Sequence, residues 1–207
     1  MKRTIFMLFT AMMFINLVSC SKCSHKEEQK NGTITTEVVK MDKAHMDSIN
    51  TNYKYFETCF VFDGTVDTLS SPDVNYVQNV FQIVDAKTNE PIVFVSEHFL
   101  KEDSVNWGEK VGAFWVGDLD LRTYIIKLSL EDAFEQLQKA NIIKPQSKYC
   151  VLRAAIGPKY CNAQYIFGND ELGVVFVDAV NGNVTNIDPA FDEFDVVNRD
   201  SIIISER

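Results

Sequence analysis

Residues 129–140, "SLEDAFEQLQKA", form the stretch that best defines the fold of this chain. Their apolar side chains recur at i, i+3, i+4 and i+7, the spacing that places them on one face of an α-helix. Ser129 can cap the first turn, and Asp132 can reach back to close a capping box. The sequence therefore predicts an amphipathic helix of about three turns, long enough to cover a sheet but too short to be stable alone. The apolar residues on its face are Leu130, Ala133, Phe134 and Leu137.

Three segments rich in β-branched and aromatic residues follow this helix: "KYCVLRA" (148–154), "AQYIF" (163–167) and "LGVVFVDA" (172–179). We predict three strands there. Asn181 and Gly182 come next, and this pair is a strong hairpin signal because both residues accept a positive φ. The sequence thus predicts an α+β fold, in which an antiparallel sheet packs on one amphipathic helix.

The same loop, residues 174–187, is rich in carboxylate and amide oxygens, so a calcium site is an alternative to a turn. A calcium loop of the EF-hand kind needs oxygen ligands at alternate positions ahead of its glycine. Val180 occupies one of those positions. We therefore predict that this loop is a turn and holds no metal.

The order of helix, three strands, turn and final strand resembles a PepSY-like domain, a small α+β module of metallopeptidase propeptides and of many exported bacterial proteins. The matching features lie within residues 128–187 and contain no catalytic motif. The resemblance implies a regulator or inhibitor of an exported peptidase that acts through strand-edge or sheet-face contacts. The residues that carry it are Leu-Ser-Leu-Glu-Asp-Ala at 128–133, Tyr165, Val-Asp-Ala at 177–179, Gly182 and Val184.

A second Val-Asp-Ala stretch lies upstream, in "VFQIVDAKTNEPIVFV" (80–95). Asn89 stands there at the position of Gly182, and asparagine is the non-glycine residue that best tolerates the left-handed conformation. One interpretation is that the chain holds two related halves. The other is that shared turn chemistry makes two hairpins look alike. Residues 41–50, "MDKAHMDSIN", have little apolar face and are a poor copy of the helix.

The first residues indicate export. Lys2 and Arg3 precede an apolar run at residues 5–18, which is the order of a secretory signal and is shorter than a membrane-spanning helix. The "LVSC" at residues 17–20 resembles the lipobox of bacterial lipoproteins, and this resemblance implies that Cys20 is acylated and becomes the new N-terminus. An ordinary signal peptide is the alternative. We expect a lipid anchor in the cell envelope, facing the periplasm or the cell surface, with the outer membrane as the expected membrane.

The expected organisation has five parts. They are a lipoprotein signal peptide (1–19), a flexible polar tether (20–33), a β-rich half that is a candidate degenerate repeat (34–120), the PepSY-like domain (121–190) and a C-terminal tail (191–207). The formal net charge of −9 argues against binding of nucleic acid, whose phosphates an acidic surface repels.

The aromatic residues Trp107, Phe114 and Trp115 are the candidate partner-binding residues, because they are interleaved with glycines. They would form a recognition patch for a protein or a sugar, or pack as core between the two halves; we favour core, since large exposed apolar patches are uncommon. Of the cysteines beyond the tether, Cys150 and Cys161 could form a disulfide. Buried thiols acting as small apolar groups are the favoured alternative for these two and for Cys59.

The sequence offers little support for catalysis. It has no GxSxG, no HExxH and no phosphate-binding glycine loop, and neither His45 nor His98 has sequence neighbours that suggest a nucleophile or metal site. We therefore predict a non-catalytic, lipid-anchored binding module with no cofactor. The rival hypothesis is an accessory lipoprotein that captures a glycan or nutrient through Trp107 and Trp115. A structural envelope protein is the third.

Overall fold

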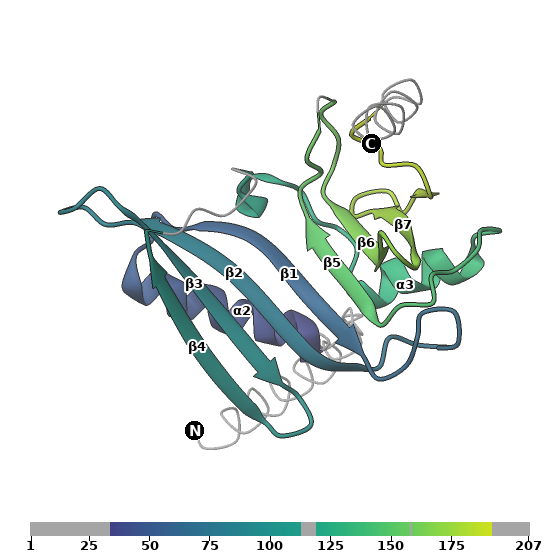
Figure 1. The fold of residues 1–207 in the computed structure, drawn as a ribbon, viewed down its shortest axis with the longest axis horizontal. Coiled ribbons are helices and arrows are strands. Elements are labelled where there is room, and N and C mark those ends of the chain that lie inside the picture. Colours follow the sequence, from purple (N-terminus) through teal and green to yellow (C-terminus); the bar gives the residue numbers. More distant parts are fainter. Residues whose placement is uncertain (1–33, 113–118, 158, 192–207) are drawn as a thin grey trace, which may run out of the picture. The chain divides into compact units, whose positions relative to one another are not determined.

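The centre of the fold is an antiparallel pair of strands from opposite halves of the chain, β1 (Lys54–Phe62) and β5 (Tyr149–Arg153). Pairing continues outward on both sides and gives one antiparallel eight-stranded sheet with the order β4-β3-β2-β1-β5-β6-β7-β8 (Figure 1). The predicted α+β class with an antiparallel sheet is therefore confirmed. The outer strands are β2 (Val74–Val84), β3 (Pro91–Phe99), β4 (Ser104–Val111), β6 (Gln164–Asn169), β7 (Gly173–Asp178) and β8 (Val184–Thr185).

This structure is a computed structural model that describes residues 34–112, 119–157 and 159–191. The predicted signal peptide, Cys20 and the tether lie outside the described residues, as do Phe114, Trp115 and the tail from residue 192 onward. The described residues all belong to one compact unit. No helix of the described residues is long and apolar enough to cross a membrane.

The helix predicted from residues 129–140 is present as α3 (Leu130–Lys139), and its predicted capping box is confirmed. The Ser129 hydroxyl accepts a hydrogen bond from the Asp132 backbone N–H at 3.1 Å, and the Asp132 carboxylate accepts one from the Ser129 N–H at 3.2 Å. All four predicted apolar residues are buried. Phe134 packs between Phe62 and Phe167, with ring centroids 5.9 and 6.0 Å away, so α3 is held by aromatic contacts to β1 and β6.

The prediction of a single helix is corrected by α2 (Ile34–Ile49), a 16-residue helix that includes most of residues 41–50, the segment interpreted as a poor copy of the other helix. Its sheet-facing side carries Thr35, Val38, Asp42 and Met46, all of them buried. Two of these four are polar. The apolar stripe that normally reveals such a helix is therefore interrupted, and the physical reason is a set of hydrogen-bond donors on the sheet beneath Asp42.

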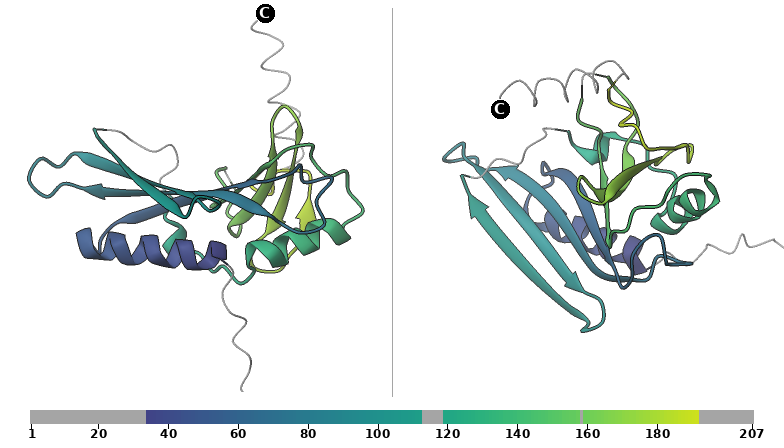
Figure 2. Two further views of the ribbon diagram at one scale, coloured as in Figure 1. Left: turned by 90° about the horizontal axis from the view of Figure 1, so that it is seen from below. Right: turned by 45° about the vertical axis from the view of Figure 1, so that its right-hand side comes forward.

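The two α-helices of the described residues lie on the same face of the sheet (Figure 2). Helix α2 packs on β2 and α3 packs on β7. Each half thus consists of a helix followed by four antiparallel strands, and the short 3₁₀ helix η2 (Leu121–Thr123) lies in the connection between the halves. The sheet continues through the β1–β5 pair from one half into the other, so the two halves share one sheet.

The two Val-Asp-Ala turns have the same hydrogen bonds. The Asp85 carboxylate accepts from the N–H groups two and three residues on, and the Asn89 N–H donates to the Asp85 carbonyl at 2.8 Å. Asp178 makes the equivalent bonds, with Gly182 in the place of Asn89. Asn89 and Gly182 have φ of 59° and 76°, as predicted for both, whereas Asn181 does not have the predicted positive φ.

These turns occupy different places in their halves. The first connects β2 to β3, whereas the second connects β7 to β8. They therefore join the second strand to the third in one half and the third to the fourth in the other. The two stretches are therefore alike because they form the same kind of turn. Their similarity does not align the first half with the second as a repeat. The interpretation of two related halves, which was based on these stretches, stays a prediction.

The second turn holds its oxygens in protein contacts. Both oxygens of Asp178 accept hydrogen bonds, the second one from the amides of Asn162 and Asn181 at 2.9 and 3.2 Å. The segment is a turn, as predicted. The cysteines Cys59, Cys150 and Cys161 are free thiols, so the disulfide alternative between Cys150 and Cys161 is wrong for this structure.

Candidate functional site

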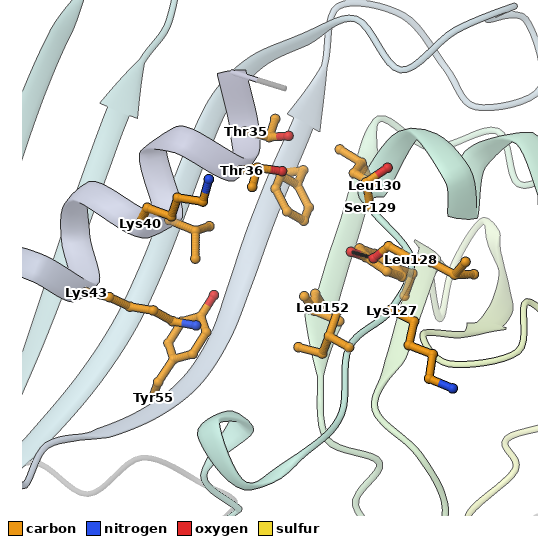
Figure 3. Close-up of a pocket in the computed structure, with 14 residues that line it drawn as sticks. Thr35, Thr36, Lys40, Lys43, Tyr55, Lys127, Leu128, Ser129, Leu130 and Leu152 are labelled. Atoms are coloured by element: carbon orange, nitrogen blue, oxygen red, sulfur yellow. Dashed lines mark hydrogen bonds between the residues drawn. The ribbon is translucent and has the colours of Figure 1, made fainter. Parts of the chain in front are cut away.

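A groove opens between the two helices, over the middle of the sheet (Figure 3). One wall is the side of α2, the other is the segment of residues 126–130 that leads into α3, and the cavity between them has a volume of about 360 Å³. We call this site the central groove. Its floor consists of Tyr55 and Phe60 from β1, Leu152 from β5 and Tyr165 from β6.

The wall on the α3 side is fixed to the sheet by backbone hydrogen bonds. The N–H groups of Lys127 and Leu128 both donate to the Ala179 carbonyl, at 2.9 and 3.0 Å. The Tyr165 hydroxyl donates to the Leu128 carbonyl at 2.9 Å. Because these bonds anchor the segment to β6 and to the end of β7, this wall is built into the fold.

Lys43 is the charged group that enters the central groove. Its ammonium lies 4.6 Å from the centroid of the Tyr55 ring, in a cation–π contact, and Figure 3 shows the side chain extending from α2 over that ring. Within the described residues, no carboxylate forms an ion pair with it. Burial lowers the pKa of Lys43, and the neighbouring charge of Asp120 opposes this shift.

The carboxylate of Asp120 is occupied elsewhere. It forms an ion pair with Arg122 at 2.9 Å and accepts the Tyr55 backbone N–H at 3.0 Å. The two other lysines that line the groove have different surroundings. Lys40 pairs with Glu37 at 3.0 Å, and the Lys127 side chain extends away from α2 (Figure 3). Lys43 is therefore the cation best placed to meet a ligand.

A buried polar cluster lies beneath α2, centred on Asp42, which is only 2% exposed. Its carboxylate accepts hydrogen bonds from the Asn79 amide at 2.6 Å, from the Ser96 hydroxyl, and from His98 Nε2 at 2.8 Å. We call Asp42, Asn79, Ser96 and His98 the Asp42 cluster. The cluster reaches the groove through Tyr55, whose hydroxyl bonds to Thr58 and to Asn79 Oδ1.

Sequence reasoning missed this cluster. Asp42 lies on a helix, whereas Ser96 and His98 lie on a strand more than fifty residues later. The local signal was the i, i+2 spacing of Ser96 and His98, which places both on one face of a strand. Although the residue types are those of a Ser-His-Asp triad, Ser96 bonds to Asp42 instead of His98 and is fully buried. A nucleophilic serine needs a base within reach and access to substrate.

Of the predicted partner-binding residues, only Trp107 lies in the described part. It is half-buried on β4, stacked against His45 of α2 at 4.3 Å between ring centroids and against Phe81 at 6.3 Å. It therefore packs between α2 and the sheet within the first half, rather than between the two halves. Nothing in the described structure brings it to the central groove.

A second hollow, of about 510 Å³, lies between residues 141–145 and β7. Its lysine, Lys144, donates to the Ala140 carbonyl at 2.8 Å. This hollow therefore offers less to a charged ligand than the central groove. Within the described ranges, no group of three or more His, Cys, Asp or Glu side chains is placed to hold a metal ion.

Comparisons of the chain with models of protein families, with curated proteins and with solved structures find no match.

Proposed function

We propose that this chain is a lipid-anchored, non-catalytic binding module of the cell envelope, and that its protein partner is an exported peptidase that it regulates or inhibits. The observation that carries the binding role is the central groove. It is a largely apolar cavity of ligand size, and the half-buried ammonium of Lys43 enters it. The anchor and the peptidase are supported by the sequence, through the lipobox-like "LVSC" and the PepSY-like pattern of residues 128–187.

The contacts around the groove support a role without catalysis. Ser129 uses its hydroxyl in the capping box of α3, where it donates to Asp132 at 2.8 Å. Tyr165 donates its proton to a backbone carbonyl, and burial raises its pKa, which disfavours the phenolate. These groups hold the walls in place. The ammonium of Lys43 places a positive charge in the groove, beside the ring of Tyr55, where it can attract an anionic ligand.

The sheet edge at β4 supports contact with a protein. β4 is a terminal strand of the sheet, and every residue along it except Trp107 is exposed. An edge of this kind can accept a strand of a partner through main-chain hydrogen bonds. The peptidase would therefore bind at β4, a strand that contributes no residue to the central groove.

Affinity capture tests the partner. A chain that starts at Ser21, which keeps the whole unit of residues 34–207, is immobilised and exposed to envelope extract. We expect recovery of an exported peptidase whose activity changes when the chain is added. Val105→Lys on the β4 edge should reduce recovery, whereas Ile143→Lys, at a residue that is 92% exposed elsewhere, should not. Recovery of no peptidase, or equal recovery by both variants, would count against the proposal.

The anchor is tested separately on the full chain. Labelled palmitate should enter the protein and should be lost in Cys20→Ser, which should also lose its membrane attachment. A full chain that takes up no label, or a variant that remains membrane-bound, would contradict the lipid anchor.

Capture of a small nutrient is the second candidate function, and the size of the groove favours it over the glycan hypothesis. The Trp107 ring already contacts the rings of His45 and Phe81. A sugar that stacks on Trp107 would compete with these contacts. Binding of a soluble glycan that Trp107→Ala abolishes, in a chain that still folds, would restore the glycan hypothesis.

A further inference from the structure

We infer that the central groove binds an aliphatic carboxylate, with the apolar chain against Phe60 and Leu152 and the carboxylate on the ammonium of Lys43. This inference rests on the proposed binding function and names its ligand class. It commits the groove to a small molecule, and it is independent of the peptidase proposed at β4.

The charge of the site selects the head group. Lys43 is a half-buried cation with an aromatic ring on one side and no ion-pair partner among the described residues. The carboxylate of a ligand would pair with this ammonium through a charge-assisted hydrogen bond. The chain as a whole carries a formal charge of −9, so small hydrophilic anions are repelled from its surface. An anion therefore needs an apolar part that gains from burial in order to enter.

The floor of the groove selects the rest of the ligand. β1 and β5 are already paired with each other beneath it, with Thr58 opposite Leu152 and Phe60 opposite Cys150. A peptide would bring several amide groups over this floor and find no strand edge to bond them, and desolvating unbonded amides is unfavourable. An aliphatic carboxylate has polar atoms at one end only, so the rest of the molecule needs only the apolar surface.

The size of the cavity sets the length of the ligand. A cavity of about 150 Å³ holds benzene, which has six non-hydrogen atoms, so about 360 Å³ holds a ligand of about twelve to fourteen such atoms. Decanoate has that size. Affinity should rise about fourfold for each added methylene, the equivalent of about 0.8 kcal/mol, until the groove is filled.

Isothermal titration calorimetry of the chain from Ser21 tests the inference with hexanoate, octanoate, decanoate and dodecanoate, each below its micelle concentration. Decanoate should bind more tightly than hexanoate, and dodecanoate should gain little more. Decanol, which has no charge, should bind at least tenfold more weakly than decanoate.

Substitutions on α2 locate the carboxylate. Lys43→Met, which removes the ammonium but keeps the aliphatic stem, should weaken decanoate binding at least tenfold, and Lys43→Arg should retain most of it. Lys139→Met is the control: it is the same change on α3, at a lysine that is paired with Glu135 and does not line the groove, and it should leave binding unchanged. Circular dichroism should show that all three variants fold.

Three results would overturn the inference. They are no binding of any carboxylate to the folded chain, equal binding of decanol and decanoate, and equal losses in Lys139→Met and Lys43→Met. Tighter binding of a hydrophobic peptide such as acetyl-Leu-Leu than of decanoate would assign the groove to a peptide instead. A failure here leaves peptidase capture intact, because that experiment depends on β4 and is changed by Val105→Lys.

Discussion

Replacing Asp42 by alanine should strongly destabilise the fold, although neither its sequence neighbours nor its residue type marks it as a core position. Asp42 is 2% exposed, and its carboxylate accepts the hydrogen bonds of three buried donors, from Asn79, Ser96 and His98. Asp42→Ala removes the acceptor and leaves all three donors in place. The substitution thus removes the hydrogen-bond acceptor while every residue of the sheet stays the same.

The magnitude follows from the cost of unpaired buried donors. Each such group costs about 1–3 kcal/mol, so three donors set an upper range of about 3–9 kcal/mol. Water that enters the space left by the carboxylate will satisfy part of this demand. Because water offsets part of the range, we expect a loss of about 4 kcal/mol here. Because whole domains are stable by about 5–15 kcal/mol, the variant should be marginally folded.

Urea unfolding of the chain from Ser21 measures this effect. With a slope of about 2 kcal/mol per molar, a loss of about 4 kcal/mol moves the midpoint by about 2 M at an unchanged slope. Asp47→Ala is the matched control, since it is the same substitution on the same helix at an exposed residue, and it should change stability by less than about 0.5 kcal/mol. A loss below about 1 kcal/mol in Asp42→Ala, or equal losses in both variants, would refute the role given to the Asp42 cluster.

Three further predictions concern the turns, the thiols and the groove. Gly182→Ala should cost about 1–2 kcal/mol in urea unfolding because its φ is 76°, whereas Asn89→Gly, at a φ of 59°, should cost nothing; the reverse order would contradict the equivalence of the two turns. Burial raises the pKa of Cys59 to about 11. In a folded chain without Cys20 and Cys23, the Cys59 thiol should therefore react with iodoacetamide at pH 8 more slowly than in the same chain unfolded in urea. Equal rates in the two states would count against its burial. Decanoate affinity should be constant near neutral pH and should fall as pH rises through the pKa of Lys43, which lies below the ordinary value of 10.5; affinity that persists to pH 10.5 would contradict an ammonium–carboxylate contact.

The second half of the fold could be predicted because its signals are local. The apolar face of α3 and its capping box lie within twelve residues, and three strands of β-branched and aromatic residues follow. The turn at Asp85 was also visible, because Asn89 has the backbone tolerance that its position requires. In each of these cases, the signal that predicts the element lies in residues close in sequence.

Helix α2 could not be found by the same means. Its buried side contains Thr35 and Asp42, which weaken the apolar periodicity, and the donors that compensate Asp42 lie on β2 and β3. Burial of this carboxylate depends on partners that come together only in the folded sheet. A pattern based on hydrophobicity therefore classifies a buried position as exposed, and the helix is missed together with the cluster.

The central groove has the same kind of origin, since its walls come from residues 35–43 and 126–130 and its floor depends on the pairing of β1 with β5. No residue in it carries a recognisable motif. The predicted candidates, Trp107, Phe114 and Trp115, were chosen for aromatic character. Trp107, the candidate that lies within the described residues, packs under α2, because a large ring near a helix gains more from burial than from exposure.

The adjacent positions of Asp42 and Lys43 connect stability with binding. Successive residues of a helix point about 100° apart. Asp42 therefore faces the sheet while Lys43 faces the groove, and the hydrogen bonds of Asp42 hold the part of α2 that carries Lys43. The same cluster holds Tyr55, the ring beneath Lys43, through Asn79. A ligand that pairs with Lys43 binds only while α2 is docked, so it should stabilise the docked state by about 2.7 kcal/mol at a hundred times its Kd. Since Asp42→Ala loosens this helix, saturating decanoate should recover part of its lost stability, and Lys43→Met should remove that recovery.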